Sequence, residues 1–263
     1  MNRIKNKTAL ITGATSGIGK ACAKALAKKK VNLILTGRRK DKLLELAKKL
    51  KQKYNVSVKI LIFDVRKQKD VENKLTQILT KVDIDILINN AGLALGLDKI
   101  DEGLLSDWDT MIDTNIKGLL YVSRVIIPYF RKKDNGHIIN LGSIAGVETY
   151  PSGNVYCATK KAVHTLSEAM NIDLFGTKIR VSNIAPGAVE TEFSNVRFHG
   201  DDFKANSVYE GYTPLSAKDI ADLIFYVLNT PEHVNIQHSL IMPTAQRNPY
   251  VLAKRELNLK KEE

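Results

Sequence analysis

Long apolar runs are missing from the 263-residue sequence. No run approaches the roughly 20 residues that a membrane-spanning helix needs. The first apolar strand-like run, residues 8–12, follows a short polar stretch that lacks the apolar core of a signal peptide. These absences argue against an integral membrane protein and against a secreted one. They predict a cytoplasmic protein without a membrane partner.

Cysteine is scarce as well, since Cys22 and Cys157 are the two in the sequence. Two cysteines make neither a disulfide framework nor a zinc site, so we expect no bound metal. Cys22 falls in a helical pattern and is expected to pack in the core. Cys157 follows a candidate catalytic tyrosine, which leaves a thiol role open, although no base is patterned around it.

Aromatic residues make up 6% of the sequence and are not interleaved with its many basic residues. The net charge is +12, from 40 Lys and Arg against 28 Asp and Glu, which by itself would suit nucleic acid. A stacking platform for bases is missing, however. The lysines gather in pairs and triplets near the ends of amphipathic segments, where cations suit helix dipoles. We therefore predict a protein that does not bind nucleic acid.

The pattern along the chain is an alternation of apolar, β-branched runs with longer segments of helical period. Nearly continuous apolar strands are typical of a parallel sheet that is covered on both faces. The alternation predicts an α/β protein with a single doubly wound parallel-sheet Rossmann domain and helices on both faces. The expected strands are 8–12, 31–36, 56–63, 84–89, 137–141, 179–184 and 236–241, and the helices are 20–30, 40–54, 67–81, 108–117, 118–132, 155–175 and 218–229.

Two stretches break this alternation. Residues 186–216 have no clear period, and a loop of that length in a compact domain is usually a functional lid. Residues 244–263 are polar and rich in lysine, so we expect a tail that either docks on a partner subunit or frays. The predicted domain spans residues 1–243, with 186–216 as its substrate lid.

A glycine-rich turn joins the first expected strand to the first helix. Gly13 permits the tight turn, Gly17 lets the backbone approach a pyrophosphate, and Gly19 lets the helix pack closely. A purely structural turn is the alternative, but the strand before and the helix after it are the context that a dinucleotide-binding turn requires. We expect this turn to bind the cofactor through Gly13, Thr15, Ser16, Gly17, Ile18 and Gly19.

The end of the second strand indicates which dinucleotide binds. NAD enzymes usually carry an acidic residue there for the ribose hydroxyls, whereas this chain has Gly37, Arg38 and Arg39. The missing acid removes a repulsion against a 2′-phosphate, and two guanidinium groups offer charge-assisted bonds to it. A solvated arginine pair would not explain why the acid is absent. The sequence predicts NADP as the cofactor.

Tyr156 and Lys160 are four residues apart, which places a phenol and an ammonium on one helix face. A fixed cation beside a tyrosine favours the phenolate, which could act as a base. Ser143 follows an apolar strand at the sheet edge where α/β proteins bind ligands, and its hydroxyl could hold a substrate oxygen. Asn115 could anchor a water that passes protons to Lys160. These four residues are the predicted catalytic group.

Taken in order, these residues resemble the short-chain dehydrogenase/reductase family over nearly the whole chain. The matching pieces are residues 12–19, 89–92, Asn115, Ser143, Tyr156 with Lys160, and Pro186 with Gly187. The resemblance implies a catalytic tetrad of Asn115, Ser143, Tyr156 and Lys160. It also implies that Tyr156 and Lys160 contact the cofactor. Further cofactor contacts are implied for Asp64, Val65, Asn90, Ala91, Gly92, Pro186, Gly187, Val189 and Thr191.

Within the family, three stretches are similar to NADP-dependent 3-hydroxy acid dehydrogenases, namely 91–96, 153–156 and 191–198. That subgroup oxidises serine, L-allo-threonine and related acids, or reduces malonic semialdehyde to 3-hydroxypropionate. Residues 187–191 are one residue shorter than the subgroup's usual form, and the last twenty residues diverge. The resemblance also implies a homotetramer, to which apolar Val163, Leu166, Ala169 and Met170 on the expected helix 155–175 could contribute.

The resulting expectation is an NADP-dependent oxidoreductase that acts on a small 3-hydroxy acid, with Ser143 and Tyr156 holding the reacting group. A reductase of 3-oxoacyl groups or of assorted carbonyls is the alternative enzyme. A catalytically silent NADP-binding regulator is the alternative from another class, although such proteins commonly lose the tetrad.

Arg197 is the residue that we expect to bind the substrate carboxylate. A buried carboxylate needs a partner, and a planar guanidinium can bind it through two parallel bonds. The alternative is that Arg197 pairs with Glu192, Asp201 or Asp202 to fold the lid.

Overall fold

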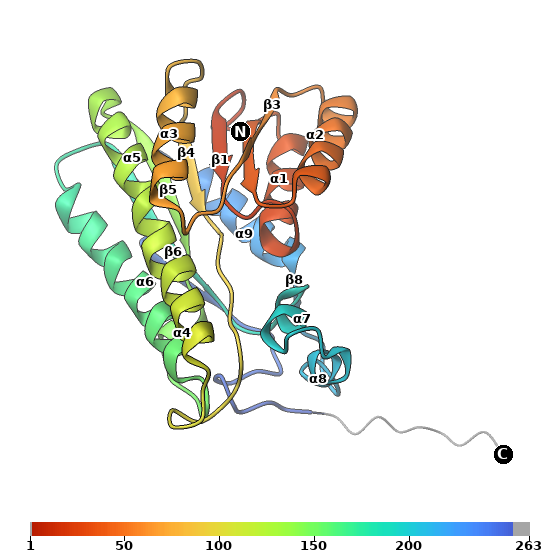
Figure 1. Cartoon of the computed structure of the whole chain (residues 1–263). Coiled ribbons are helices and arrows are strands. Elements are labelled where there is room, and N and C mark those ends of the chain that lie inside the picture. Colours follow the sequence, from red (N-terminus) through yellow and green to blue (C-terminus); the bar gives the residue numbers. More distant parts are fainter. Residues whose placement is uncertain (1, 255–263) are drawn as a thin grey trace.

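The computed structural model describes residues 2–254 (Figure 1). Its centre is a seven-stranded sheet in the order β3-β2-β1-β4-β5-β6-β9, and every neighbouring pair is parallel. The expected α/β fold with a parallel, doubly wound sheet is confirmed. The strands are β1 (Thr8–Ile11), β2 (Asn32–Gly37), β3 (Val58–Ile62), β4 (Ile86–Asn89), β5 (Gly136–Leu141), β6 (Ile179–Pro186) and β9 (His238–Ile241).

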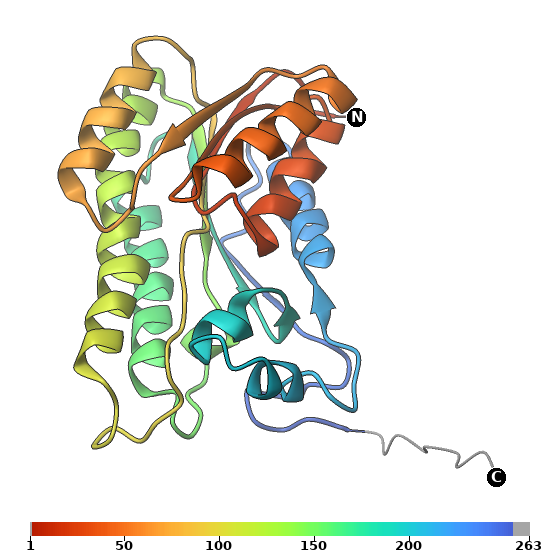
Figure 2. The same ribbon diagram turned by 45° about the vertical axis from the view of Figure 1, so that its right-hand side comes forward.

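Helices cover both faces of the sheet, as Figures 1 and 2 show from two sides. Helices α1 (Gly17–Lys28), α2 (Lys40–Tyr54) and α9 (Ala217–Leu228) lie on one face, and α3 (Gln68–Leu79), α5 (Gly118–Lys133) and α6 (Asn154–Asp173) lie on the other. An apolar core lies on each face of the sheet, and successive residues of β1 point into the two cores alternately. Ala9 and Ile11 belong to one apolar cluster, and Leu10 belongs to the other. This is why the strands read as continuous apolar runs.

The order of the strands reverses between β1 and β4, which both lie in the middle of the sheet. From β1 the chain winds outward to β2 and β3, and it then returns to β4 and continues to β5, β6 and β9 on the other side. A crevice at the carboxyl ends of the strands forms at such a switch point. The fold therefore places a ligand site where the glycine turn follows β1.

A π-helical turn, Asp113–Lys117, connects α4 (Leu105–Ile112) to α5. The sequence pattern predicts two helices that meet at this point, but it gives no sign of the wider turn. Such turns occur often at functional sites because the extra residue changes where a side chain points. Here the turn contains the buried Asn115.

Short elements fill the stretch after β6 that the sequence left without a period. They are β7 (Val189–Glu190), α7 (Phe193–Arg197), α8 (Asp202–Ser207) and β8 (Leu215–Ser216), and β7 pairs with β8. In Figure 1, α7 and α8 lie beyond the carboxyl ends of the strands. We call residues 186–216 the lid.

The polar segment after β9 folds back on its own chain. Gln246 is buried, and Asn248 and Tyr250 both donate hydrogen bonds to the carboxylate of Glu148, at 3.0 Å each. The sequence pattern predicts a tail that either docks on a partner subunit or frays, and it does not indicate packing of this segment on its own chain. Residues 255–263 of the predicted tail lie outside the described residues.

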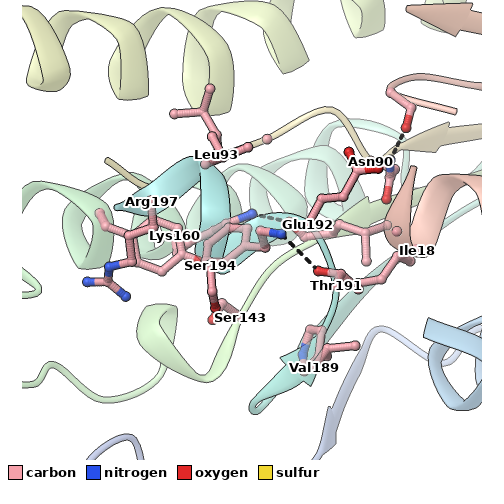
Figure 3. Close-up of a pocket in the computed structure, with 18 of the residues that line it drawn as sticks. Ile18, Asn90, Leu93, Ser143, Lys160, Val189, Thr191, Glu192, Ser194 and Arg197 are labelled. Atoms are coloured by element: carbon pink, nitrogen blue, oxygen red, sulfur yellow. Dashed lines mark hydrogen bonds between the residues drawn. The ribbon is translucent and has the colours of Figure 1, made fainter. Parts of the chain in front are cut away.

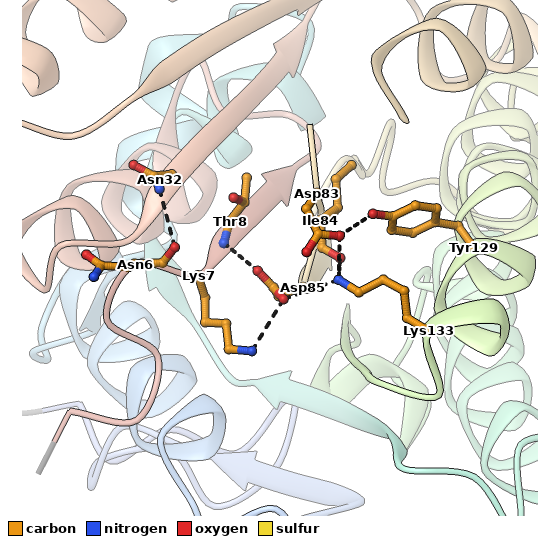
Figure 4. A network of polar contacts seen from close by, with 9 residues as sticks. All are labelled: Asn6, Lys7, Thr8, Asn32, Asp83, Ile84, Asp85, Tyr129 and Lys133. Atoms are coloured by element: carbon orange, nitrogen blue, oxygen red, sulfur yellow. Dashed lines mark hydrogen bonds and ion pairs between the residues drawn. The ribbon is translucent and has the colours of Figure 1, made fainter. Parts of the chain in front are cut away.

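A network of charges joins β1, β4 and α5 at the amino-terminal edge of the sheet, opposite the switch point (Figure 4). The ammonium of Lys133 lies 2.6 Å from Asp83 and 3.3 Å from Asp85. Asp85 also accepts a hydrogen bond at 2.9 Å from the backbone N–H of Thr8, and Tyr129 donates one to Asp83. The network fixes the start of two central strands.

Within residues 2–254, no helix is long and apolar enough to cross a membrane.

Candidate active site

A cavity of about 580 Å³ lies at the carboxyl edge of the sheet (Figure 3). Its wall includes the glycine turn, the ends of β2, β4 and β5, the first turns of α6, and the lid. In Figure 3, Arg197, Lys160 and Ser143 are drawn toward one end and Asn90 and Ile18 toward the other. A volume of this size is typical of a small-molecule or cofactor site.

The glycine turn has the geometry that its sequence requires. Gly13 and Gly17 adopt left-handed φ angles of +64° and +49°, which disfavour other residues. A Cβ on Gly19 would lie 2.5 Å from the carbonyl oxygen of Gly13 and 2.5 Å from the amide nitrogen of Asn90. Gly19 thus allows the start of α1 to pack on the turn, behind the cavity that Gly13 and Gly17 line.

The amino terminus of α1 is open toward the cavity, since Ser16 makes no side-chain capping hydrogen bond there. Uncapped backbone N–H groups at a helix start bind phosphate well, because they combine donors with the positive end of the helix dipole. The amide of Asn90 holds the turn in place by donating to the carbonyl oxygens of Thr12 and Gly13, at 2.8 and 3.1 Å. The turn fits a dinucleotide pyrophosphate.

Two arginines lie where the ribose of a bound dinucleotide would reach the end of β2. The guanidinium of Arg39 donates to the hydroxyls of Thr15 and Ser16, each at 2.7 Å. Arg38 is more exposed, and its guanidinium lies 4.0 Å from the carboxylate of Asp64. Cations and hydroxyl groups gathered in this way fit the 2′-phosphate of NADP.

Asp64 remains a carboxylate beside these arginines. Burial alone would raise its pKa, but hydrogen bonds from Arg66 and the charges of Arg66 and Arg38 outweigh burial and lower it. Arg66 is the nearer partner, at 2.6 Å, so Arg38 keeps most of its donors available.

Tyr156 and Lys160 lie one turn apart on α6, and both side chains are buried. The ammonium of Lys160 is 6.0 Å from the centre of the Tyr156 ring and donates to the carbonyl oxygen of Leu141 at 2.8 Å. Ser143 lies two residues after the end of β5 and also lines the cavity. The structure therefore brings together three of the four predicted catalytic residues at the cavity wall.

Asn115 lies behind that wall. Its amide oxygen accepts from the backbone N–H of Leu93 at 2.9 Å, and its amide nitrogen donates to Leu93 and to Thr159. A Cβ on Gly92 would lie 3.2 Å from the Asn115 oxygen and 3.5 Å from the Lys160 ammonium. Gly92 thus keeps clear the space between these two side chains, where a proton-carrying water is predicted.

The pKa values of the Tyr–Lys pair differ from the sequence expectation. Burial raises the pKa of Tyr156, and the nearby Tyr150 raises it further, while a hydrogen bond with Ser143 acts in the opposite direction. Burial lowers the pKa of Lys160 to about 8. The expected lowering of the Tyr156 pKa by Lys160 is therefore not found, because burial has the largest effect on this phenol.

The remaining predicted cofactor residues all lie on the cavity wall. They are Asp64, Val65, Asn90, Ala91, Gly92, Pro186, Gly187, Val189 and Thr191.

Arg197, on α7, stacks against two tyrosines. The guanidinium carbon lies 5.5 Å from the ring centre of Tyr150 and 5.8 Å from that of Tyr156, and Nε donates to the carbonyl oxygen of Gly96 at 3.1 Å. Among the described residues Arg197 forms no ion pair, so the predicted alternative of a bridge to Glu192, Asp201 or Asp202 is not found. Its charge remains available at the cavity wall.

Tyr150 and Gln246 are among the wall residues that reasoning from sequence missed. Tyr150 carries no pattern before α6, and Gln246 is a lone glutamine in a polar segment. A Cβ on Gly187 would lie 2.4 Å from the Gln246 amide oxygen, so that close contact requires a glycine. No sequence pattern indicates that a polar residue in a polar segment, such as Gln246, will be buried.

The two thiols take no part in the site's chemistry. Burial raises the pKa of Cys22 to about 12 and also raises that of Cys157. A reactive cysteine needs a thiolate, so the possible thiol role of Cys157 finds no support. Among residues 2–254, no group of three or more His, Cys, Asp or Glu side chains could hold a metal ion.

Comparison with known proteins places this geometry in a family context. Residues 7–202 match the family described as short chain dehydrogenase. An NADP-dependent 3-hydroxy acid dehydrogenase of Schizosaccharomyces pombe is 46% identical over 94% of this chain and 96% of its own length. Sulfoacetaldehyde reductase 2 of Chromohalobacter salexigens is 44% identical over 90% of this chain and 94% of its own length.

A solved structure is also similar. The closed form of serine dehydrogenase complexed with NADP⁺ superposes with a TM-score of 0.86 at 40% identity, and the match covers 95% of this chain and all of that chain.

Proposed function

The chain belongs to the short-chain dehydrogenase family, and we propose that this NADP-dependent oxidoreductase acts on a small 3-hydroxy acid. Serine, L-allo-threonine and 3-hydroxypropionate are the proposed substrates in the direction of oxidation, and malonic semialdehyde is the substrate of the reverse reaction. The named relatives support this class of substrate.

The observation that carries the proposal is the position of Arg197. Its guanidinium lies beside Tyr156, the proposed proton carrier, and it has no carboxylate partner among the described residues. A 3-hydroxy acid bears its carboxylate two carbons from the reacting carbon, so one molecule could reach both groups. A charge-assisted pair would offset the cost of removing that carboxylate from water.

Tyr156, Ser143 and Lys160 have separate proposed roles. The hydroxyl of Ser143 holds the substrate oxygen, and the Tyr156 oxygen takes the hydroxyl proton in oxidation or gives it back in reduction. Lys160, buried and cationic, attracts negative charge on Tyr156 and orients the ribose of the cofactor. NADP supplies the hydride acceptor or donor at its nicotinamide ring. Burial of Tyr156 and Lys160 keeps these reacting groups in a fixed geometry.

A second candidate substrate is a small aldehyde that carries a sulfonate. The 44% identical sulfoacetaldehyde reductase favours it, and a guanidinium binds a sulfonate as it binds a carboxylate. A general carbonyl reductase is the third possibility, in which the anionic group of the substrate would have no effect.

Turnover with a matched panel of substrates tests the proposal. NADPH absorbance is followed with serine, L-allo-threonine and 3-hydroxypropionate, with neutral alcohols of similar size, and in reduction with malonic semialdehyde, sulfoacetaldehyde and propanal. The proposal expects the highest kcat/KM for the carboxylates. Faster reaction of sulfoacetaldehyde than of malonic semialdehyde would favour the second candidate, and equal use of propanal would favour the third.

We also propose a homotetramer in the cytoplasm. Val163 and Met170, two of the residues that suggested an interface on α6, are buried within the chain and cannot contact a partner. Ile172, in the last turn of the same helix, and Phe175, two residues beyond its end, are 75% and 91% exposed. Neighbouring apolar side chains at such exposure are typical of a protein interface.

A further inference from the structure

Glu192 is a lid carboxylate that reaches across to the opposite wall of the cavity. It accepts a hydrogen bond from Arg39 at 2.8 Å and lies 3.4 Å from the ammonium of Lys42. Arg39 precedes α2 and Lys42 lies in its first turn, whereas Glu192 precedes α7. These contacts span about 150 residues of sequence, since the pairs are separated by 153 and 150 positions.

The other lid carboxylates with recorded side-chain partners stay within the lid. Asp201 pairs with Lys204, and Asp202 accepts a hydrogen bond from Asn195. Glu192 is therefore placed differently from its neighbours. The positive charges of Arg39 and Lys42 also lower its pKa, led by the hydrogen bond from Arg39, so that it is a carboxylate at neutral pH.

The residue before Glu192 lies close to the glycine turn. A Cβ on Gly17 would lie 3.4 Å from the Cβ of Thr191. Figure 3 shows Thr191 and Glu192 near Ile18, at the start of α1. The lid thus lies directly over the helix terminus that is suited to the pyrophosphate.

We propose that Glu192, Arg39 and Lys42 form a clasp that holds the lid closed over the cofactor, and that NADPH leaves after this clasp opens. Glu192 is then a positioning residue, since it acts through the lid and touches neither substrate nor hydride. The proposal depends on the cofactor being NADP and not on the identity of the substrate.

The exposure of the pair suits a reversible contact. The Arg39 and Glu192 side chains are 42% and 50% exposed, so their ion pair adds little to the stability of the fold. Water and salt can reach it, which makes it easy to break and sensitive to ionic strength. A clasp that must open in every catalytic cycle needs this property.

The geometry of Arg39 favours a clasp over a competition between Glu192 and the 2′-phosphate. Arg39 meets Glu192 through Nη1 and meets Thr15 and Ser16 through Nε and Nη2. The two sides of the guanidinium group can therefore serve two anions at once. Because Glu192 is bound through Nη1 and the hydroxyl groups through Nε and Nη2, phosphate binding at Thr15 does not require Glu192 to leave.

Release of NADPH from the full-length protein tests the clasp directly. NADPH is bound, excess NADP⁺ is added in a stopped-flow instrument, and the loss of bound NADPH fluorescence gives the dissociation rate. We expect Glu192→Gln to release NADPH about two- to fivefold faster, the range expected for losing an exposed ion pair. The matched control is Glu190→Gln, which removes the same charge from an exposed lid residue that has no ion pair among residues 2–254.

Three results would overturn the proposal. One is an unchanged rate in Glu192→Gln, and another is an equal acceleration in Glu190→Gln, which would show a general effect of lid charge. Slower release from Glu192→Gln would show that Glu192 competes with the 2′-phosphate for Arg39. A salt series adds a second readout, because the clasp requires release from the parent to accelerate with salt more steeply than release from Glu192→Gln. These rates depend on the cofactor alone. If the substrate panel contradicted the proposed substrate class, the test of the clasp would therefore still be valid.

Discussion

Gln246 accepts a hydrogen bond from the backbone N–H of Ala188 at 2.8 Å, and it thereby joins the segment after the last strand to the first residues of the lid. Gln246 is buried, and both residues line the cavity. The wall near Pro186 and Gly187 is thus built from two parts of the chain. The lid is anchored at this end by Gln246 and is closed over the glycine turn by Glu192.

The first prediction concerns the proton carrier. Tyr156→Phe should lower kcat by at least about 10²-fold, because it removes the ionisable oxygen and leaves the ring in place. NADPH binding, measured by fluorescence titration, should change little. The control Tyr226→Phe makes the same change on an exposed face of α9 and should retain parent activity. Parent-like turnover of Tyr156→Phe at every pH would remove this residue from the mechanism.

The second prediction concerns cofactor choice. Replacing Arg38 and Arg39 with Met should raise the KM for NADP by about 10- to 100-fold, the cost of losing charge-assisted bonds to the 2′-phosphate. The KM for NAD, which lacks that phosphate, should rise far less. Lys40→Met, an exposed neighbour without an ion pair among the described residues, is the control. Equal activity of the parent enzyme with NAD would contradict the assignment.

The third prediction concerns the substrate anion. Arg197→Met should lower kcat/KM for serine or 3-hydroxypropionate by about 10- to 100-fold, since a charged hydrogen bond is lost. A neutral alcohol of similar size should be affected much less. Lys204→Met removes a lid cation that pairs with Asp201, and it should affect both substrates equally. An equal loss for both substrates in Arg197→Met would mean that Arg197 only folds the lid.

The fourth prediction concerns the charge network at the far edge of the sheet. Lys133→Met should lower the free energy of unfolding by about 1–3 kcal/mol, because Asp83 loses its cation and the mostly buried Asp85 keeps only Lys7, at 3.4 Å. The exposed neighbour Lys132, which has no ion pair among residues 2–254, provides the control Lys132→Met. Chemical denaturation at neutral pH measures the free energy of unfolding of both variants.

The same network predicts that the free energy of unfolding depends on pH. The folded protein lowers the pKa of Asp83, where the opposing burial effect is outweighed by hydrogen bonds from Lys133 and Tyr129, and it raises the pKa of Lys133. The Asp83 contribution is therefore complete above its unfolded pKa of about 4 and is lost as pH falls through the lower folded value. The Lys133 contribution is complete below about pH 10 and is lost at higher pH. The difference between parent and Lys133→Met should thus shrink below pH 4; a constant difference would contradict this.

The fifth prediction concerns assembly. Light scattering at micromolar concentration should give the mass of four 29.3 kDa chains. Replacing Ile172 and Phe175 with Glu should yield a smaller species, because two charges would have to be buried in the interface. A monomeric parent protein would refute the tetramer.

Much of the fold could be predicted because a few physical constraints leave clear marks in the sequence. Buried parallel strands must be apolar on both faces, and α2 was placed at the bounds that the structure has. The glycine turn was recognisable because positive φ angles and close packing require glycine at Gly13, Gly17 and Gly19. Such local requirements can be read without knowledge of distant contacts.

Other features depend on contacts that no local pattern encodes. Helices α7 and α8 have five and six residues, too few for a helical period to emerge. Gln246 is buried and accepts a hydrogen bond from Ala188, 58 positions earlier in the chain. The pKa of Tyr156 reflects how fully α6 is covered, which spacing to Lys160 does not reveal. These parts of the site required three-dimensional information.

The burial of both cysteines also makes the lid accessible to observation. Neither Cys22 nor Cys157 should react with maleimide reagents at neutral pH, since each thiol is covered and protonated. A cysteine introduced at Phe203, 83% exposed on α8, would then be the single reactive thiol of the protein. A fluorophore attached there could report opening and closing of the lid in individual molecules, without first removing a native cysteine.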